Sequence, residues 1–240
     1  DDDPVNCELM KSRLPEVLTI DLPSDSSEYS TILQNMREFD VLKITDEDSK
    51  RGQMYLEQKQ RHELEDRVTN LDEFLEQLNL KVKIKSADKF SIPRISQLTL
   101  KTNQFNLTTK RYQEEEIKNL VENENIEIVY AQVQDKFGDN GITSMYILNK
   151  TNPQEWYLDT FLLSCRIMGR QIEKCIMQHI ISKAKTNGVK KIKADYLQTK
   201  KNKPIENFLP DCGFVNENNS WTFNVNEEFK YPDFIEVIDE

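Results

Sequence analysis

The chain has 240 residues, and 32 basic residues against 42 acidic ones give it a formal net charge of -10. This charge argues against bulk attraction to nucleic acid or to an anionic membrane surface. No apolar run approaches the length of about eighteen residues that a membrane-spanning helix needs, and no charged-then-apolar leader opens the chain, so we expect a cytoplasmic location. The four cysteines form no C-x-x-C pair, which indicates neither a zinc site nor a disulfide framework and favours reduced thiols in or near cores.

The first part of the chain predicts α/β structure that is too small to close a sheet of its own. The residue pattern predicts helices over 5–13 and around 29–39, with a short strand at 17–20 between them. A polar, strongly helical stretch follows, in which Asn70 and Glu73 have the spacing of a capping box. A helix that is polar nearly all round usually bridges domains or packs along one stripe. We therefore expect a first unit at 1–44, a helical connector at 45–78 and a domain at 79–240.

The order of elements is clearer in the predicted domain. We expect elements in this order: a strand at 80–84, helices at about 92–104 and 113–122, strands at 126–134, 141–148 and 155–165, a helix after Gly169 that ends at Asn187-Gly188, a strand at 189–197, a short helix at 204–209 and a final strand pair. This order resembles that of the GNAT acyltransferases. The resemblance implies an α/β fold with a mixed central sheet and flanking helices.

A glycine-marked turn lies between the strand at 155–165 and the next helix. Gly169 lets the backbone turn tightly and leaves the first N–H groups of the helix unpaired at the positive end of its dipole, an arrangement that binds phosphate. The turn resembles the Arg/Gln-x-x-Gly-x-Gly/Ala signature that holds the pyrophosphate of coenzyme A in GNAT enzymes, although Gln171 departs from it. Plain strand–helix packing gives the same pattern. The candidate cofactor-binding residues are Arg166, Ile167, Met168, Gly169, Arg170, Gln171 and Asn202.

The charge of the chain is unevenly distributed. The segment from Arg166 to Lys203 holds 11 basic residues and two acidic ones, so it carries +9 and the rest of the chain carries -19. Such a segment suits a phosphate-bearing ligand or an acidic partner. A solvated lysine-rich face is an equally good interpretation.

Three stretches resemble the FkbH-like proteins, which join a haloacid-dehalogenase (HAD) phosphatase-like domain to a C-terminal GNAT-like domain. The stretches are RISQLTLKTNQFNLTTKRY at 94–112, DKFGDNG at 135–141 and DTFLLSCRIMGR at 159–170. The resemblance implies that 1–44 is the C-terminal remnant of a HAD-like α/β domain. Asp1-Asp2-Asp3-Pro4 would then be its last acidic motif, with Asp1 and Asp2 as ligands for Mg²⁺ only together with the missing HAD half. We expect no phosphatase activity from this chain alone.

The resemblance also implies a function. Family members are implicated in taking a three-carbon acyl group from a phosphorylated glycolytic intermediate and loading the glyceryl unit onto the phosphopantetheine thiol of a carrier protein. We therefore expect a GNAT-like domain that binds phosphopantetheine or coenzyme A, with an acyl carrier protein as partner. An acetyl-CoA-dependent N-acetyltransferase acting on a small amine is the first alternative. A non-catalytic module that docks a carrier protein is the second.

The candidate catalytic residues are few. Leu209 stands where GNAT enzymes often carry a tyrosine that protonates the leaving thiolate, and a leucine cannot act as an acid. Asp159 is a candidate base, and Cys165 is a candidate nucleophile if Arg166 and the helix N-terminus stabilise its thiolate, although a strand cysteine is more often buried. A further set of polar residues either lines the binding site for the acyl or pantetheine group or forms a hydrogen-bonded loop. Its members are Gln97, Asn103, Asn106 and Thr108.

Overall fold

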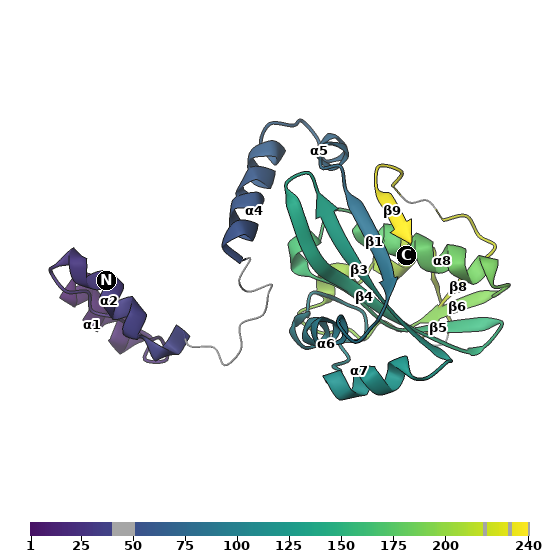
Figure 1. Ribbon diagram of the computed structural model, residues 1–240, viewed down its shortest axis with the longest axis horizontal. Coiled ribbons are helices and arrows are strands. Elements are labelled where there is room, and N and C mark those ends of the chain that lie inside the picture. Colours follow the sequence, from purple (N-terminus) through teal and green to yellow (C-terminus); the bar gives the residue numbers. More distant parts are fainter. Residues whose placement is uncertain (40–50, 218–219, 230–231, 240) are drawn as a thin grey trace. The chain divides into compact units, whose positions relative to one another are not determined.

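The computed structural model describes residues 1–39, 51–217, 220–229 and 232–239 (Figure 1). It contains two compact units, Asp1–Ser49 and Lys50–Glu240. Residues 50–78 of the predicted connector therefore belong to the second unit, whereas the predicted division lay at 78/79. Residues 45–50, with which the predicted connector begins, lie outside the described residues. No helix in the described part of the chain is long and apolar enough to cross a membrane.

The first unit consists of short helices. They are α1 (Pro4–Arg13), a 3₁₀ turn (Ser26–Glu28), α2 (Tyr29–Asn35) and a second 3₁₀ turn (Arg37–Phe39). Asp3 caps α1 by accepting a hydrogen bond from the backbone N–H of Val5 at 2.8 Å. The strand predicted at 17–20 is wrong, because no described segment pairs with these residues to complete a ladder. Cys7 is the one buried side chain among residues 1–38.

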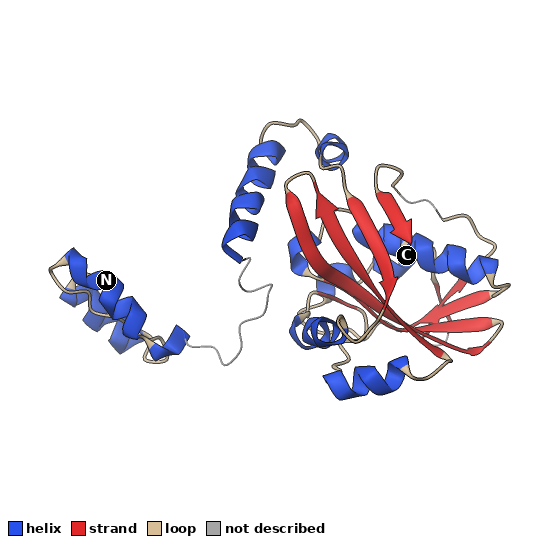
Figure 2. Ribbon diagram, in the orientation of Figure 1, coloured by secondary structure: helices blue, strands red, loops and turns tan. Residues whose placement is uncertain are grey.

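The second unit is built on a nine-stranded sheet (Figure 2). Its strands are β1 (Lys81–Ser86), β2 (Phe105–Asn106), β3 (Ile126–Asp135), β4 (Gly138–Asn152), β5 (Glu155–Leu163), β6 (Lys191–Ala194), β7 (Val215–Glu217), β8 (Ser220–Asn224) and β9 (Glu236–Asp239). The order across the sheet is β7-β8-β6-β5-β4-β3-β1-β9, with β2 paired to β5. The pairs β5–β6 and β1–β9 are parallel and the other pairs are antiparallel. The predicted mixed central sheet is confirmed.

Helices cover both faces of this sheet. They are α4 (Arg51–Glu65), α5 (Leu71–Gln77), α6 (Ile92–Lys101), α7 (Glu114–Val121), α8 (Ile172–Thr186) and α9 (Phe208–Asp211), with 3₁₀ turns at Cys165–Ile167 and Lys203–Ile205. Buried side chains of α5, α8 and α9 share one core cluster, and those of α6 and α7 share a second. The predicted cap of α5 is confirmed, because Asn70 accepts from the Glu73 N–H while the Glu73 carboxylate accepts from the Thr69 N–H.

Two strands were not predicted. β9 returns to lie beside β1, with Val82 opposite Val237, and β2 is a two-residue strand inside a polar stretch. The predicted strand at 189–197 is shorter in the structure, where β6 covers only Lys191–Ala194. Pairing across long stretches of sequence accounts for both unpredicted strands, since neither has the length or alternation that marks a strand locally.

Candidate functional site

The strands β5 and β6 separate at Asp159. On β4, Leu148 lies opposite Leu158 and Ile147 lies opposite Thr160, so Asp159 is an extra residue without a partner on β4. Such a bulge bends its strand. The parallel pairing of β5 with β6 also ends there, at Leu158 and Ala194. The bulge therefore starts a gap between two neighbouring parallel strands.

The chain's own segment 105–108 fills this gap. Phe105 lies opposite Leu163, and the Leu107 N–H donates to the carbonyl of Phe161 at 3.1 Å. On the other side of the gap, the N–H of Leu197 donates to the carbonyl of Leu107 at 2.8 Å. The four residues of the segment are between 0% and 4% exposed. The edge of β5 beyond the bulge is thus already paired.

Two asparagines fix this segment. The Asn106 side chain donates to the carbonyl of Thr102 at 3.3 Å and accepts from the Thr109 N–H at 2.9 Å. The Asn202 side chain donates to the carbonyls of Asn106 and Leu197, each at 3.0 Å, and accepts from the Thr199 N–H at 2.7 Å. Both asparagines are 0% exposed. Among the described residues, none of the hydrogen bonds of Asn202 reaches the turn at 166–171. The sequence analysis predicted that Asn202 and this turn bind the cofactor together.

The other members of the predicted polar lining also have protein partners. Thr108 donates to the carbonyl of Asp159 at 3.1 Å. Gln97 is hydrogen-bonded to Arg94, and Asn103 to Arg111. These contacts are those of a hydrogen-bonded loop, which was the second of the two interpretations. A role for these residues in lining a ligand site stays a prediction.

The Asp159 carboxylate lies in a half-buried polar cluster on β5. It accepts from the Tyr112 hydroxyl at 2.7 Å and from the Thr160 hydroxyl at 2.9 Å, and it forms an ion pair with Lys110. Burial, followed by the hydrogen bond to Asp159, raises the pKa of Tyr112. Tyr112 is therefore a neutral hydrogen-bond donor at ordinary pH.

A second carboxylate lies close to the first. Asp195, directly after β6, accepts from the Tyr157 hydroxyl at 2.8 Å and from the Ser220 hydroxyl at 3.1 Å. Burial raises the pKa of Tyr157 as well. The Lys110 ammonium lies 5.9 Å from the Tyr157 ring centre and so links the two groups. Sequence reasoning named Asp159 and missed Lys110, Tyr112, Tyr157 and Asp195. The alternation of Tyr157 and Asp159 along one strand was the available signal.

The turn at 166–171 has the backbone of an anion site. Gly169 and Gln171 have φ angles of +81° and +60°, and α8 begins at Ile172. Within the described chain, the N–H groups of Gly169, Gln171 and Ile172 donate to no protein acceptor. A Cβ placed on Gly169 would meet nothing within 4 Å, so the backbone is open to an approaching group. These features fit a phosphate.

One side chain at the start of α8 opposes an anion. Glu173 lies in the first turn of the helix, and its Oε2 atom is buried without a hydrogen-bond partner among the described residues. Burial raises the pKa of this carboxyl. When ionised, it adds a negative charge beside the N–H groups that would bind a phosphate.

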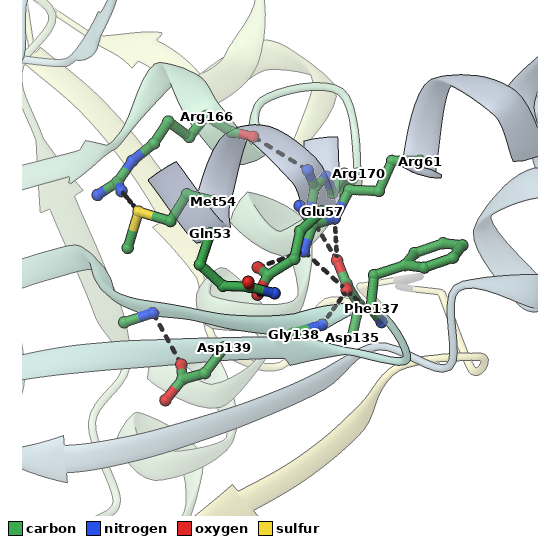
Figure 3. A network of polar contacts seen from close by, with 11 residues as sticks. Gln53, Met54, Glu57, Arg61, Asp135, Phe137, Gly138, Asp139, Arg166 and Arg170 are labelled. Atoms are coloured by element: carbon green, nitrogen blue, oxygen red, sulfur yellow. Dashed lines mark hydrogen bonds and ion pairs between the residues drawn. The ribbon is translucent and has the colours of Figure 1, made fainter. Parts of the chain in front are cut away.

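The two arginines of the turn make internal contacts (Figure 3). Arg170 is 6% exposed, pairs with Asp135 at 3.0 Å and donates to the Arg166 carbonyl at 3.1 Å. Burial lowers the pKa of the Arg170 guanidinium to about 10, although Asp135 opposes the shift. The half-buried Arg166 side chain contacts the sulfur of Met54 on α4 at 3.1 Å. Of the remaining predicted contacts, Ile167 is fully buried and Met168 is half-buried.

The predicted environment of Cys165 is corrected by the structure. The cysteine is exposed and lies in a 3₁₀ turn, because β5 already ends at Leu163. The other three thiols are buried, as expected. The role of Cys165 as a nucleophile stays a prediction.

Metal binding by the first unit also stays a prediction. The Asp1 carboxylate accepts from the Asp3 N–H at 3.0 Å. In the described ranges, no group of three or more His, Cys, Asp or Glu residues could hold a metal ion.

Comparisons with known proteins find similarity at the level of structure. No protein-family model matches the chain, and no curated protein matches its sequence. A Desulfovibrio desulfuricans protein described as a GNAT-family acetyltransferase aligns at 11% identity over 60% of this chain and 99% of its own, with a TM-score of 0.47. The ribosomal-protein-S18-alanine N-acetyltransferase of Escherichia coli aligns at 10% identity over 62% and 97%, with a TM-score of 0.48.

A third solved structure is the spermidine N-acetyltransferase of Vibrio cholerae in complex with CoA and spermine. It aligns at 12% identity over 60% of this chain and 95% of its own, with a TM-score of 0.48. At such identities and scores, the assignment of the fold rests on the strand order of the chain itself. That order contains every strand and helix expected for a GNAT-like domain, together with β2 and β9.

Proposed function

We propose that the second unit is an acyltransferase-type domain that binds the phosphate end of coenzyme A, or of a carrier protein's phosphopantetheine arm, at the turn 166–171. The observation that carries this proposal is the open backbone at Gly169, where three N–H groups at the start of the 15-residue helix α8 have no acceptor among the described residues. The thiol of coenzyme A or of the arm would carry the acyl group as a thioester.

The Asp159 cluster lies on the same strand that leads into this turn. Ser164 lies five residues after Asp159 in extended chain, which corresponds to about 16 Å. An acceptor placed at the cluster would find a carboxylate and two tyrosine hydroxyls. We assign Asp159 the role of taking a proton from the acceptor, for which it must release one of its present donors.

The family resemblance supplies the finer form of the proposal. The acyl group would be a glyceryl-type three-carbon unit, delivered through the absent HAD half, and the partner would be an acyl carrier protein. Carrier proteins are generally acidic, and the exposed residues Lys190, Lys191, Lys200 and Lys201 belong to the +9 segment. Charge complementarity of this kind sets orientation and association rate more than affinity.

One observation favours a second candidate, the non-catalytic docking module. The segment 105–108 closes the gap between β5 and β6, so an extended arm cannot lie along β5 without displacing it. Acetyl-CoA-dependent N-acetylation needs the same turn and, in addition, an acid that replaces the tyrosine absent at Leu209. A docking module needs neither the gap nor the acid.

Calorimetric titration at low salt tests the proposal. We expect coenzyme A and a phosphopantetheinylated carrier protein to bind the wild-type chain. Gly169→Val should weaken coenzyme A binding at least tenfold. Gly188→Val is the matched control, since Gly188 also has a positive φ, of +71°, and open space around it, but lies at the other end of α8. The proposal is overturned if neither coenzyme A nor the phosphopantetheinylated carrier protein binds.

An activity measurement separates the two candidates. In an acyl-transfer assay from an acyl thioester to the carrier protein, Asp159→Asn should lower the rate at least a hundredfold with little change in coenzyme A affinity. A wild-type chain that binds the carrier protein but transfers no acyl group would favour the docking module.

A further inference from the structure

We propose that Arg61, on α4, is a positioning residue that holds the ligand turn 166–171 in its open form, acting through Asp135 and Arg170. The inference rests on the proposed function of this turn. Arg61 touches no ligand in this proposal. It lies 105 residues before Arg166, in a helix that the sequence presents as polar nearly all round.

The centre of the arrangement is the buried carboxylate of Asp135 (Figure 3). Its side chain is 0% exposed. Arg61 donates to it twice, from Nε at 2.7 Å and from Nη2 at 2.9 Å. Arg170 donates from Nη1 at 3.0 Å, and the backbone N–H groups of Phe137 and Gly138 donate at 3.0 and 3.2 Å. Two guanidinium groups thus share one carboxylate, and their hydrogen bonds to it fix the position of each group.

Arg170 carries this constraint into the turn. Its Nη2 donates to the carbonyl of Arg166 at 3.1 Å, so the side chain of one end of the turn closes on the backbone of the other end. The turn needs such support, because Gln171 is a non-glycine residue at φ +60°. Backbone of this kind persists only where the surrounding structure determines it.

A second contact fixes α4 against the sheet. The carboxylate of Glu57 lies 3.6 Å from Arg61, one helical turn away, and it also lies against the backbone of Gly138. A Cβ at position 138 would come within 2.2 Å of Glu57 Cδ, so a side chain there would displace the Glu57 carboxylate from its present position. Glu57 and Arg61 are 7% and 3% exposed. The buried stripe of α4 therefore consists of charged groups whose partners lie at the end of β3 and at the start of β4.

Loss of Arg61 has a specific geometric consequence. With Arg61 gone, two acceptor positions on the Asp135 carboxylate become vacant, and Arg170 can donate to them from both of its terminal nitrogens, since a guanidinium binds a carboxylate in bidentate fashion. Arg170 would then release the carbonyl of Arg166. The turn would lose the contact that spans it, while the sheet beneath it would keep its own pairing.

The test compares Arg61→Met and Arg61→Lys with Lys59→Met in the full chain. Lys59 is exposed on the same helix and serves as the matched control. The first readout is the ratio of the affinities for coenzyme A and for pantetheine, which lacks the phosphates. Arg61→Met should reduce this ratio at least tenfold, Arg61→Lys should restore part of it, and Lys59→Met should leave it within twofold.

The second readout needs no ligand. Amide hydrogen exchange at 166–172 should be at least tenfold faster in Arg61→Met than in the wild type, with exchange in β5 and in the second half of α8 unchanged. If wild-type chain does not bind coenzyme A, the proposed function falls, and exchange alone decides the positioning role. A folded Arg61→Met chain with unchanged exchange at 166–172 overturns the inference. If Arg61→Met does not fold, Arg61→Lys decides by the same exchange measurement.

Discussion

At the scale of single residues, the least favourable group in the candidate site is Glu173. Its Oε2 atom is buried and has no partner in the described structure, and Glu173 lies in the first turn of α8, the helix that begins at the proposed phosphate site. Because burial raises its pKa above 4.5, the folded state holds the proton more tightly than the unfolded state does. The ionised carboxylate therefore costs stability as the pH rises through the raised pKa.

We predict that Glu173→Gln stabilises the protein at neutral pH by about 1 kcal/mol, the usual scale for relieving an unsatisfied buried group. The gain should vanish as the pH falls to 4.5 and below, where Glu173 is protonated in both states. Thermal unfolding between pH 4 and pH 8 measures this dependence. Coenzyme A affinity should also rise.

Glu63→Gln is the control for this prediction, since Glu63 is exposed on α4. This substitution should change neither the stability of the protein nor its affinity for coenzyme A. A variant at position 173 that is less stable than the wild type at pH 7 would show that the carboxylate has a favourable role.

The residues of the site differ in how far the sequence could identify them. Gly169 and Asp159 carry local signals, a glycine before a helix and a charge inside an apolar strand. Tyr112 and Lys110 reach Asp159 from positions 47 and 49 residues earlier in the chain, so no spacing rule connects them. The exposure of Cys165 depends on where β5 ends, and strand ends are poorly fixed by sequence patterns.

At the scale of elements, the feature that governs access to the site is the segment 105–108. It replaces β6 as the neighbour of β5 beyond the bulge, and Asn202 ties it to the loop after β6. Thr109, just after the segment, has a φ of +52°, which is unfavourable for a β-branched residue. The segment is therefore held by tertiary contacts rather than by local preference.

We predict that Asn202→Ala destabilises the protein by about 2–3 kcal/mol, because it leaves the buried carbonyl of Asn106 and the partly buried carbonyl of Leu197 without their donor. Amide exchange at Leu107 and Leu197 should accelerate more than exchange elsewhere in the sheet. If the arm of a ligand lies along β5, coenzyme A affinity should increase in this variant.

The comparison variant is Asn103→Ala, whose amide lies near the surface on the same stretch. Asn103→Ala should lower the free energy of unfolding by less than half as much as Asn202→Ala does. Equal effects of the two substitutions on exchange at Leu107 would contradict a specific role for Asn202 in closing the gap.

Elements with strong local patterns could be predicted, and those formed by distant pairing could not. The sequence indicated the helix after Gly169, the cap of α5 and the three long strands because each carries its own periodicity or capping residues. It did not indicate β2 or β9, which exist only as partners of β5 and β1. It left open whether the helix now seen as α4 bridges domains or packs along one stripe, because the buried stripe contains Glu57 and Arg61, whose charges gave no sign of burial.

At the scale of the whole molecule, the two compact units differ in how much they bury. Among residues 1–38 only Cys7 is buried, whereas the second unit holds both core clusters. Burial of apolar surface supplies most of the free energy of folding. The cooperative unfolding of the chain should therefore come from the second unit.

We predict that a chain of residues 51–240 unfolds within about 2 °C of the full chain, because it keeps α4 and both core clusters. A chain of residues 70–240 should unfold about 4–8 °C lower. It lacks the Arg61 donors to Asp135 and the packing of Leu64 and Val68 against the core, a loss of about 2 kcal/mol in a domain of this size. Differential scanning calorimetry of the three chains at one pH and one protein concentration measures both steps.

Equal unfolding temperatures for 51–240 and 70–240 would show that α4 is a connector, as its sequence suggests, and would remove the basis for its action on the turn. A large drop on removal of 1–50 would instead show that the first unit is part of the cooperative structure.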